Sequence, residues 1–438
     1  MTRPIDLNKY QRLLDSRSFV RYSGKVTKVV GLTIEAEGPE THVGALCHIR
    51  SRNNKTVMAE VVGFKDKHVL LMPIGDMSGI GPGNLVVAAD KDLEVGVGPA
   101  LLGRVLDGLG RPIDDKGPLE IEQYYPVENT PPNPMTRPRI HQILPLGVKC
   151  IDGLLTVGKG QRMGIFAGSG VGKSTLMGMI ARNTKADINV IALIGERGRE
   201  VRDFLERDLG EEGLKRSVVV IATSDQPALI RLKGALVATA IAEYFRDCGK
   251  DVLLLMDSLT RFSMAQREIG LAVGEPPVTR GYTPSVYALM PKLLERSGTS
   301  DRGSITGLYS VLVDGDDMNE PITDTARGIL DGHIALSRQL AHRNHYPAVD
   351  VLASISRVMN DIVDDEHKKS ANELRRNLAV YRDAEDLINV GAYVKGSNPA
   401  IDRSIALIQG INDFLTQGTT ERFTYNETVE LLHKAVQG

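Results

Sequence analysis

The residues with the clearest chemical signature form a glycine-rich stretch at 167–175, Ala-Gly-Ser-Gly-Val-Gly-Lys-Ser-Thr. An apolar run at 162–166 precedes it and a helix-forming run at 176–182 follows, so the context is strand, turn and helix. Glycines let backbone amides turn inward around phosphate oxygens, and the amino end of the helix adds its positive dipole. Lys173 is expected to reach the β- and γ-phosphates of a nucleotide, and the Ser174 hydroxyl to bind Mg²⁺.

The sequence therefore predicts a phosphate-binding loop. One position departs from the usual pattern, because Ala167 replaces the first glycine, but alanine tolerates ordinary strand dihedrals and the match is only slightly weaker. The loop residues expected to contact the nucleotide are Gly168, Ser169, Gly170, Val171, Gly172, Lys173, Ser174 and Thr175.

Two acidic residues follow apolar runs that have the composition of buried parallel strands. Asp257 ends the run 251–257, where a carboxylate beside the phosphate-binding loop would hold Mg²⁺ through water. Glu196 follows the run 188–194; its carboxylate could orient or deprotonate an attacking water molecule, or it could serve a helix dipole. Arg197 could contact a phosphate group or be a surface charge. With the loop, these residues would supply what phosphoryl hydrolysis requires.

Two further residues have two interpretations each. Arg357 closes the apolar segment 349–355, where it could be a structural ion-pair partner or a finger that reaches the γ-phosphate bound by a neighbouring chain. Spacing alone does not decide between these roles, because a finger that acts in trans requires an oligomer. Tyr346 could stack on adenine, although a buried structural tyrosine is the safer interpretation of an isolated residue.

The order of apolar runs divides the chain into parts of different character. Residues 1–18 contain an amphipathic segment that binds a partner or docks on its own domain. Residues 19–92 consist of short alternating runs, which predict a small antiparallel β-barrel for assembly. Residues 93–360 predict an α/β domain whose parallel sheet is covered on both faces, and residues 361–438 a mostly helical domain. The proline-rich stretch 126–138 predicts extended chain at a domain boundary.

Bulk composition argues against a general nucleic-acid-binding or membrane-binding protein. The 438 residues include 53 Lys and Arg against 55 Asp and Glu, so the net charge of −2 offers no general attraction to nucleic acid or to an anionic membrane. The barrel region contains few aromatic residues for the stacking platforms that bind oligonucleotides. The three cysteines lack metal-ligand spacing, which indicates a reducing compartment. With no apolar leader or membrane-length segment, we expect a soluble, cytoplasmic protein.

Five segments in a fixed order resemble the catalytic subunits of rotary ATPases, and most closely the ATPases of type III protein export. These segments are residues 167–174, 195–200, 254–261, 346–350 and 354–358. Overall likeness, including residues 131–137, makes the chain more similar to the flagellum-specific export ATPase than to the virulence-secretion version. The resemblance implies a RecA-like P-loop ATPase core, preceded by the small antiparallel barrel and followed by the helical C-terminal domain.

The resemblance also implies a role for each matching residue, with ATP and Mg²⁺ as the ligands. Lys173 and Ser174 would bind phosphate and Mg²⁺, Asp257 would be the aspartate on the metal side, and Glu196 the catalytic carboxylate.

Three more residues receive roles in the same way. Arg197 would sense the γ-phosphate, Tyr346 would stack on adenine, and Arg357 would be the finger offered to the neighbouring subunit. The family implies a ring of six identical subunits with sites at the interfaces, which fits a chain that holds both Glu196 and Arg357.

The partners implied by the resemblance are those of a protein-export apparatus. Residues 1–18 would bind a regulator, and the helical C-terminal domain would meet a central-stalk-like protein, chaperones and export substrates. The ring would work with membrane proteins of the export gate, at the inner face of the cytoplasmic membrane. No nucleic-acid partner is expected.

Two departures from the synthase pattern matter for the alternatives. Thr419 and Thr420 stand near the place of a second adenine-packing aromatic residue, which predicts looser nucleotide binding, and the mixed charges of residues 363–374 replace an acidic lever segment. The alternatives that remain are a virulence-secretion ATPase, a catalytic subunit of an ATP synthase, an RNA-translocating hexamer of the transcription-termination type, and a nucleotide-binding subunit without hydrolysis.

Overall fold

The computed structural model describes residues 22–51, 55–89, 91–313, 315 and 317–437, and the chain forms two compact units. The first unit comprises the chain up to Leu93 together with Ile269–Glu275, and the second comprises the rest. The predicted partner-binding segment 1–18 lies outside the described residues. No helix within the described ranges has both the length and the apolar character needed to cross a membrane.

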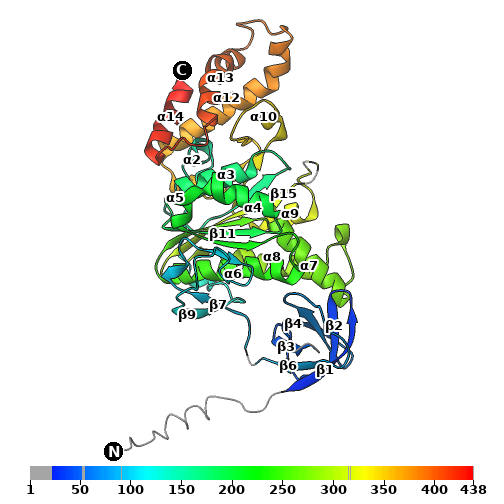
Figure 1. Ribbon diagram of the computed structural model, residues 1–438. Helices are drawn as coiled ribbons and strands as arrows, with labels where there is room; N and C mark the ends of the chain where they lie inside the picture. Colours follow the sequence, from blue (N-terminus) through cyan, green and yellow to red (C-terminus); the bar gives the residue numbers. More distant parts are fainter. Residues whose placement is uncertain (1–21, 52–54, 90, 314, 316, 438) are drawn as a thin grey trace, which may run out of the picture. The chain divides into compact units, whose positions relative to one another are not determined.

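The first unit contains a closed barrel of antiparallel strands in the order β1-β2-β5-β4-β3-β6 (Figure 1). Its strands are β1 (Ser23–Val30), β2 (Thr33–Glu37), β3 (Leu46–Arg50), β4 (Thr56–Lys65), β5 (His68–Pro73) and β6 (Leu85–Ala88). Side chains alternate between the inside and the surface, as in β3, where Cys47 and Ile49 are buried while His48 and Arg50 are exposed. Small aliphatic side chains fill the interior, and the predicted barrel is confirmed.

The second unit is built on a nine-stranded sheet with the order β17-β16-β10-β15-β13-β11-β12-β8, to which β14 adds beside β15. Its strands are β8 (Val105–Asp107), β10 (Arg162–Ala167), β11 (Ile188–Ile194), β12 (Ser217–Ala222), β13 (Asp251–Asp257), β14 (Gly298–Thr299), β15 (Ser304–Leu312), β16 (Gly332–Leu336) and β17 (Ile355–Ser356). All pair in parallel except β14 and β17, which are antiparallel to their neighbours. A separate pair joins β7 (Glu94–Val97) to β9 (Gln123–Pro126).

Helices cover both faces of this sheet, as predicted for near-continuous apolar strands. One face carries α3 (Lys173–Asn183), α4 (Gly198–Asp203) and α5 (Gly210–Lys215), and the other carries α6 (Ala228–Asp247) and α8 (Pro284–Glu295) (Figure 1). Helix α7 (Leu259–Val273) begins in the second unit, and its residues from Ile269 onward belong to the first. The remaining short helices and turns of the second unit are α9 (Pro321–Ile329), α10 (Arg338–His342), α11 (Met359–Ile362), η1 (Pro99–Leu101), η2 (Pro134–Thr136), η3 (Phe204–Leu209) and η4 (Thr279–Gly281). The sheet is therefore the middle of three layers.

The chain ends in three packed helices, α12 (Asp365–Asn389), α13 (Pro399–Leu415) and α14 (Tyr425–Gln437), which also contact α2 (Lys149–Leu154). The Asp364 side chain caps α12 by accepting a hydrogen bond from the His367 amide. The buried His367 ring bonds the Gly153 carbonyl at 2.7 Å and the Tyr425 hydroxyl at 2.9 Å. These contacts tie the C-terminal helices to the rest of the second unit.

Three local expectations need correction. The proline-rich stretch 126–138 is not a boundary, because the division into units falls at Leu93 and this stretch bonds to the second unit, for example from Asn129 to Glu243. The apolar spacing of residues 200–209 predicts one helix between two strands, but the structure has α4 followed by the π-helical turn η3. The strands β15 and β16 are additional to the predicted ones, because serine, threonine and glycine interrupt their apolar pattern although β15 is almost entirely buried.

Candidate nucleotide-binding site

The glycine-rich stretch connects β10 to α3, and β10 lies between β15 and β16 within the sheet. Gly170 and Gly172 have φ values of 78° and 90°, in the left-handed region that favours glycine. The Val171 side chain is buried in the hydrophobic core, which anchors the loop from within. The first amides of α3 have no partner inside the helix, so the loop presents donors suited to phosphate oxygens.

A cavity of about 560 Å³ lies above this loop. Its lining comes from the loop at 167–170 and 172–175, from residues 195–197 after β11, from residues 312–313 after β15, and from Glu200, Ser224 and Arg261. These segments follow parallel strands, whose carboxyl ends meet at one edge of the sheet. Ligands of open α/β sheets bind at this edge.

Two carboxylates and one ammonium group meet at the same edge. The Lys173 ammonium donates a hydrogen bond to Oδ1 of Asp257, the buried last residue of β13. Glu196 Oε1 lies 3.9 Å from the same Nζ atom. The pKa of Glu196 is raised to about 7, first by burial and then by the Asp257 carboxylate, while the Lys173 ammonium opposes the rise. A carboxylate with this pKa can accept a proton from water near neutral pH.

Ser310 holds Asp257 from a second direction. Its hydroxyl, fully buried in β15, donates a 2.6 Å hydrogen bond to the Oδ1 atom that Lys173 also contacts. The sequence pattern does not single out Ser310, since its position becomes meaningful only when β15 is placed beside β13. Asp257 is thus oriented by one charged and one neutral donor.

Two arginines line the cavity with different surroundings. Arg197 precedes α4, is highly exposed, and lies 3.6 Å from Glu200. Arg261, on α7, packs so closely that a Cβ atom on Gly195 would lie 2.8 Å from its side chain. The buried Nε atom of Arg261 has no hydrogen-bond partner among the described residues. Arg261 is a candidate for anion binding that the sequence indicates only through its place in the segment 254–261.

Tyr346 lies beside the phosphate-binding loop. A Cβ atom on Gly172 would lie 3.5 Å from the tyrosine ring, and Tyr346 is 41% exposed, so the interpretation as a buried structural residue is wrong. The Gln417 amide donates a 2.9 Å hydrogen bond to the Tyr346 carbonyl, and the Thr419 carbonyl accepts one of 2.7 Å from Arg182 on α3. The segment after α13 therefore borders the loop on the side where adenine is expected.

Arg357 lies at the opposite edge of the sheet, where the parallel strands begin. Strand β16 runs parallel to β10, with Leu336 beside Ala167, whereas Ser356 pairs with Gly332 at the beginning of β16. The four residue steps between these positions span about 13 Å at the usual rise of about 3.3 Å per residue. The exposed Arg357 guanidinium makes no hydrogen bond or ion pair with any residue that the structure describes, and it does not line the cavity. The structure does not bring Arg357 to the site of its own chain.

Comparison with known proteins places the chain in a family. Residues 26–89 match the beta-barrel domain and residues 147–356 the nucleotide-binding domain of the ATP synthase alpha/beta family, and residues 363–434 match the C-terminal domain of the T3SS EscN ATPase. The flagellum-specific ATP synthase of Bacillus subtilis is 57% identical over 432 residues, which cover 97% of this chain and 98% of that one. The chain belongs to the type III export ATPases.

Other members of this ATPase family give the same result. The type 3 secretion system ATPase of Xanthomonas euvesicatoria is 52% identical, with 96% of each chain covered. The assembled ATPase EscN of the enteropathogenic E. coli type III secretion system has a similar structure, with a TM-score of 0.90 and 46% identity over 94% of this chain and 100% of that one. The predicted fold, family and ATPase activity are confirmed.

The oxygen donors of this export ATPase fit Mg²⁺ bound together with a nucleotide. The Ser174 hydroxyl borders the cavity, and the carboxylates of Asp257 and Glu196 lie around Lys173. Mg²⁺ is commonly held by one or two carboxylates, waters and substrate phosphates. Within the described ranges no group of three or more His, Cys, Asp or Glu side chains forms a metal site.

Proposed function

We propose that this export ATPase works as a ring of six identical subunits that hydrolyses MgATP to energise flagellar protein export. One observation carries the proposal. A single chain presents its phosphate-binding loop with Glu196 at one edge of the sheet and, at the other, Arg357, whose guanidinium has no partner among the described residues. Identical copies can therefore complete one another's sites. The assembled state of the similar EscN ATPase supports the ring.

The hydrolytic roles follow from the positions in the cavity. The amides of residues 168–175 bind the phosphates, and Lys173 moves its hydrogen bond from Asp257 to the β- and γ-phosphates. Ser174 and Asp257 would hold Mg²⁺, which would supply positive charge beside the phosphates. Glu196 orients the attacking water and accepts its proton, which its raised pKa favours.

Three side chains complete the nucleotide site in this proposal. Arg197 contacts the γ-phosphate from the mouth of the cavity, and Tyr346 stacks on adenine beside Gly172. Arg357 of the neighbouring subunit stabilises the negative charge that develops during phosphoryl transfer.

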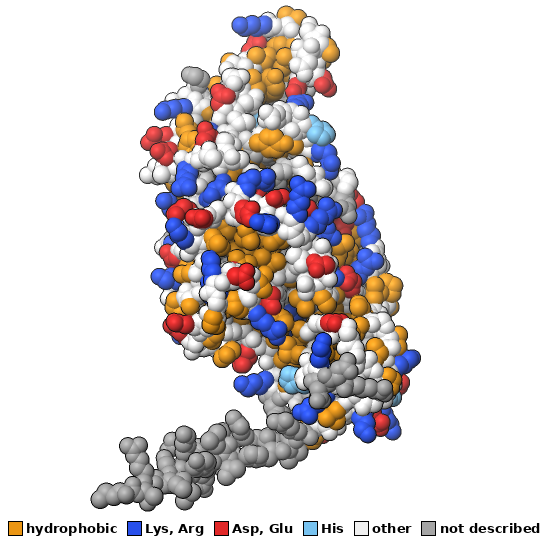
Figure 2. Space-filling view, viewed as in Figure 1, with side chains coloured by type: hydrophobic (Ala, Val, Ile, Leu, Met, Phe, Trp, Pro, Cys, Tyr) orange, Lys and Arg blue, Asp and Glu red, His pale blue; other side chains and the backbone are white. Residues whose placement is uncertain are grey.

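The remaining parts of the chain receive roles in assembly. The barrel region 19–92 holds neighbouring subunits together, the ATPase domain spans 93–360, and residues 361–438 meet the partners. The structure of EscN with its central stalk EscO supports a stalk-like partner for the C-terminal helices. Hydrophobic side chains gather in the middle of the visible face of the second unit, framed by charges of both signs (Figure 2), as expected of a protein–protein contact surface.

The cellular setting is proposed on the same family basis. The ring is cytoplasmic and peripheral at the inner face of the membrane, where export-gate proteins, chaperones and export substrates are its partners, and residues 1–18 bind a regulator. Flagellar export is favoured over virulence secretion because two flagellum-specific relatives reach 57% and 56% identity, above the 52% and 51% of two type 3 secretion relatives, whereas other flagellum-specific relatives have 47–50%. Restored motility in a Bacillus subtilis strain that lacks its own flagellum-specific ATP synthase would support this choice, and failure despite normal expression would favour secretion.

The deciding experiment measures ATP hydrolysis per subunit over a wide range of protein concentration, without partners or RNA, alongside the ring size. We expect the rate to rise steeply where rings form, because assembly completes each site. A rate that is unchanged between monomer and ring would contradict the shared site, and hydrolysis that depends on RNA would favour the RNA-translocating alternative.

A further inference from the structure

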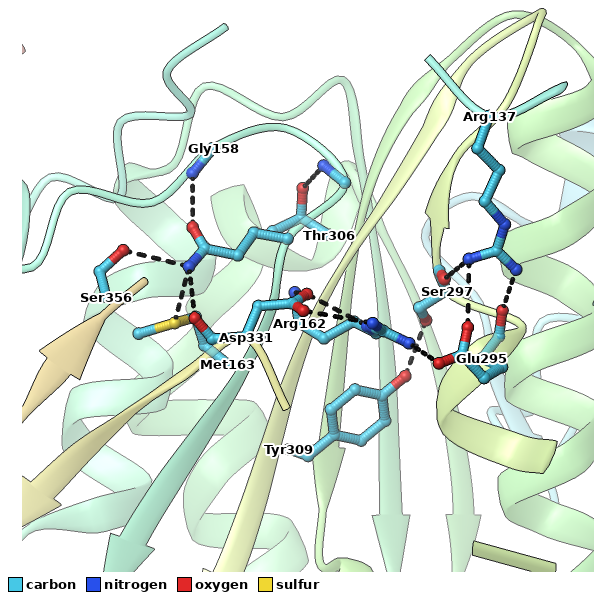
Figure 3. A network of polar contacts seen from close by, with 12 residues as sticks. Arg137, Gly158, Arg162, Met163, Glu295, Ser297, Thr306, Tyr309, Asp331 and Ser356 are labelled. Atoms are coloured by element: carbon cyan, nitrogen blue, oxygen red, sulfur yellow. Dashed lines mark hydrogen bonds and ion pairs between the residues drawn. The ribbon is translucent and has the colours of Figure 1, made fainter. Parts of the chain in front are cut away.

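A buried amide organises the edge of the sheet that carries Arg357. The Gln161 side chain, immediately before β10, is fully buried. Its Oε1 atom accepts a 2.9 Å hydrogen bond from the Gly158 amide, which fixes the orientation of the side-chain amide. Its Nε2 atom donates to the Ser356 hydroxyl at 3.1 Å and to the Asp331 carbonyl at 3.2 Å. Figure 3 shows these partners converging from separate segments of the chain.

The Met163 sulfur lies 3.2 Å from the same Nε2 atom as a third acceptor. The two oxygen acceptors, on Ser356 and Asp331, both hold the backbone around Arg357 in place. Ser356 directly precedes Arg357, and its hydroxyl donates a 2.9 Å hydrogen bond to the Thr156 carbonyl. The Asp331 carbonyl accepts a second hydrogen bond, 3.0 Å long, from the Arg357 amide. Gln161 therefore bonds to the residue before Arg357 and to the carbonyl that holds the Arg357 backbone.

The residue that supplies this carbonyl, Asp331, is itself held by an ion pair through its side chain. The Asp331 carboxylate accepts hydrogen bonds from the Arg162 amide at 3.0 Å and from its Nε and Nη2 atoms at 3.1 and 3.2 Å, and Arg162 also pairs with Glu295 (Figure 3). By contrast, β17 has only two residues and pairs with β16 alone. So short a strand cannot by itself hold a catalytic arginine in register.

We propose that Gln161 is a positioning residue for Arg357, and that it acts on the reaction of the neighbouring subunit, not on the site of its own chain. The inference rests on the proposed role of Arg357 in trans. Gln161 should act on the neighbouring site because it bonds to the segment that presents Arg357. The phosphate-binding loop of its own chain lies at the far end of β10. A misplacement of about 1 Å at such a group can lower a rate by about 10²-fold.

The first test replaces Gln161 with methionine, which keeps the volume but removes both hydrogen-bonding functions. We expect Gln161→Met to lower kcat by about 10-fold or more, with ring formation preserved and the KM for ATP within about twofold of the native value, as for loss of an interaction made only in the transition state. Thr306→Val is the matched control, since Thr306 is buried in the same network and its hydroxyl accepts a hydrogen bond from the Gly160 amide, away from Arg357. Should Gln161→Met fold poorly, Ser356→Ala removes a single acceptor.

The second test distinguishes positioning from a structural defect by mixing subunits. Gln161→Met subunits retain their phosphate-binding loop, and Lys173→Ala subunits retain a well-placed Arg357. We expect rings assembled from both to hydrolyse ATP faster than either alone, under single-turnover conditions with ATP below the concentration of sites, so that one complete interface is sufficient.

The outcomes separate this inference from the proposed function. A gain with Gln161→Met supports the positioning role. No gain, when Arg357→Ala mixed with Lys173→Ala does recover, would overturn it and leave the shared site standing. No gain from either mixture would overturn the trans role of Arg357 and with it this inference, while hydrolysis by the native ring would remain. A Gln161→Met enzyme with native kcat would also overturn it.

Discussion

Lys173 and Asp257, 84 residues apart in the sequence, are joined by a hydrogen bond between the lysine ammonium and the aspartate carboxylate. The residue expected to clamp the phosphates is thus paired with the residue expected to face the metal. Under the proposed function, binding of MgATP would exchange this contact for two others, from lysine to phosphate and from aspartate to the hydrated metal. The pair keeps a buried carboxylate compensated until the ligand arrives.

Ser310 provides a direct way to disturb Asp257 without changing its charge. We expect Ser310→Ala to raise the free Mg²⁺ concentration needed for half-maximal hydrolysis by about 10-fold to 100-fold. This is the usual cost of removing a hydrogen bond to a metal-ligand side chain. Titration of the hydrolysis rate with free Mg²⁺ measures this effect. Thr306→Val, on the same strand but bonded to Gly160, should leave the titration unchanged.

Replacement of Glu196 tests the assignment of the general base. Glu196→Gln keeps the size of the side chain and should lower kcat by about 10²-fold to 10⁴-fold, the range typical of such groups. Binding of a fluorescent ATP analogue should persist, since the phosphate-binding loop is untouched. A Glu196→Gln enzyme with more than a tenth of native turnover would mean that another group activates the water.

The raised pKa of Glu196 predicts a pH dependence of activity. The carboxyl must be ionised to accept a proton, so kcat/KM should rise with pH and level off above about 7. The profile is measured at constant ionic strength with saturating Mg²⁺. The residual activity of Glu196→Gln should lack this rise; an identical rise in the variant would assign the titration to a different group.

The same shift predicts a pH dependence of stability with the opposite sign. The Glu196 pKa rises from its ordinary value of 4.5 to about 7 in the folded chain, so the native state holds this proton more tightly than the unfolded state. Its contribution to the free energy of unfolding should therefore fall as pH increases from about 4.5 to about 7. Denaturant unfolding of the native protein and of Glu196→Gln across this range should diverge in that direction; parallel curves would contradict the shift.

Removal of Arg357 should separate hydrolysis from binding. We expect Arg357→Ala to lower kcat by about 10³-fold to 10⁵-fold, as for other arginine fingers, while nucleotide affinity measured on the monomer stays unchanged because the side chain lies away from its own cavity. Arg403→Ala, which changes an exposed arginine of α13, is the control. Weakened binding by the Arg357→Ala monomer would argue for a role within one chain.

The position of Tyr346 predicts an effect on affinity and little on chemistry. Stacking of a base on an aromatic side chain contributes about 1–3 kcal/mol, so Tyr346→Ala should raise the KM for ATP by about 10-fold or more, and Tyr346→Phe should stay near the native value. Initial rates over a range of ATP concentration measure both. Equal KM values for the alanine and phenylalanine variants would remove adenine stacking as its role.

Local pattern was sufficient for the parts of this molecule that depend on neighbouring residues in the chain. The glycines of 167–175 and the apolar runs that end near Glu196 and Asp257 predict a loop and two carboxylates at one sheet edge, and the structure brings these groups within hydrogen-bonding or near-contact distance of Lys173. The barrel follows from alternation of short runs in the same way.

Other features depend on pairing between distant segments. The polar residues of β15 interrupt the apolar pattern by which a buried strand is predicted. The contact of Ser310 with Asp257 could not be predicted either, because it forms between two adjacent strands. The sequence shows that Arg357 follows an apolar run. Its place at the edge where the parallel strands begin depends on the antiparallel pairing of β17 with β16. No spacing in one chain could supply these relationships.

The placement of Arg357 and the phosphate-binding loop at opposite edges of one sheet affects how many complete interfaces an assembly of identical chains can contain. If Arg357 acts on the neighbouring subunit as proposed, any open row of subunits leaves one arginine at one end and one cavity at the other without a counterpart, so there is one working interface fewer than there are chains. Closing the row removes both loose ends at once. In such a ring the last subunit to join would complete two interfaces, whereas each earlier subunit after the first would add a single interface.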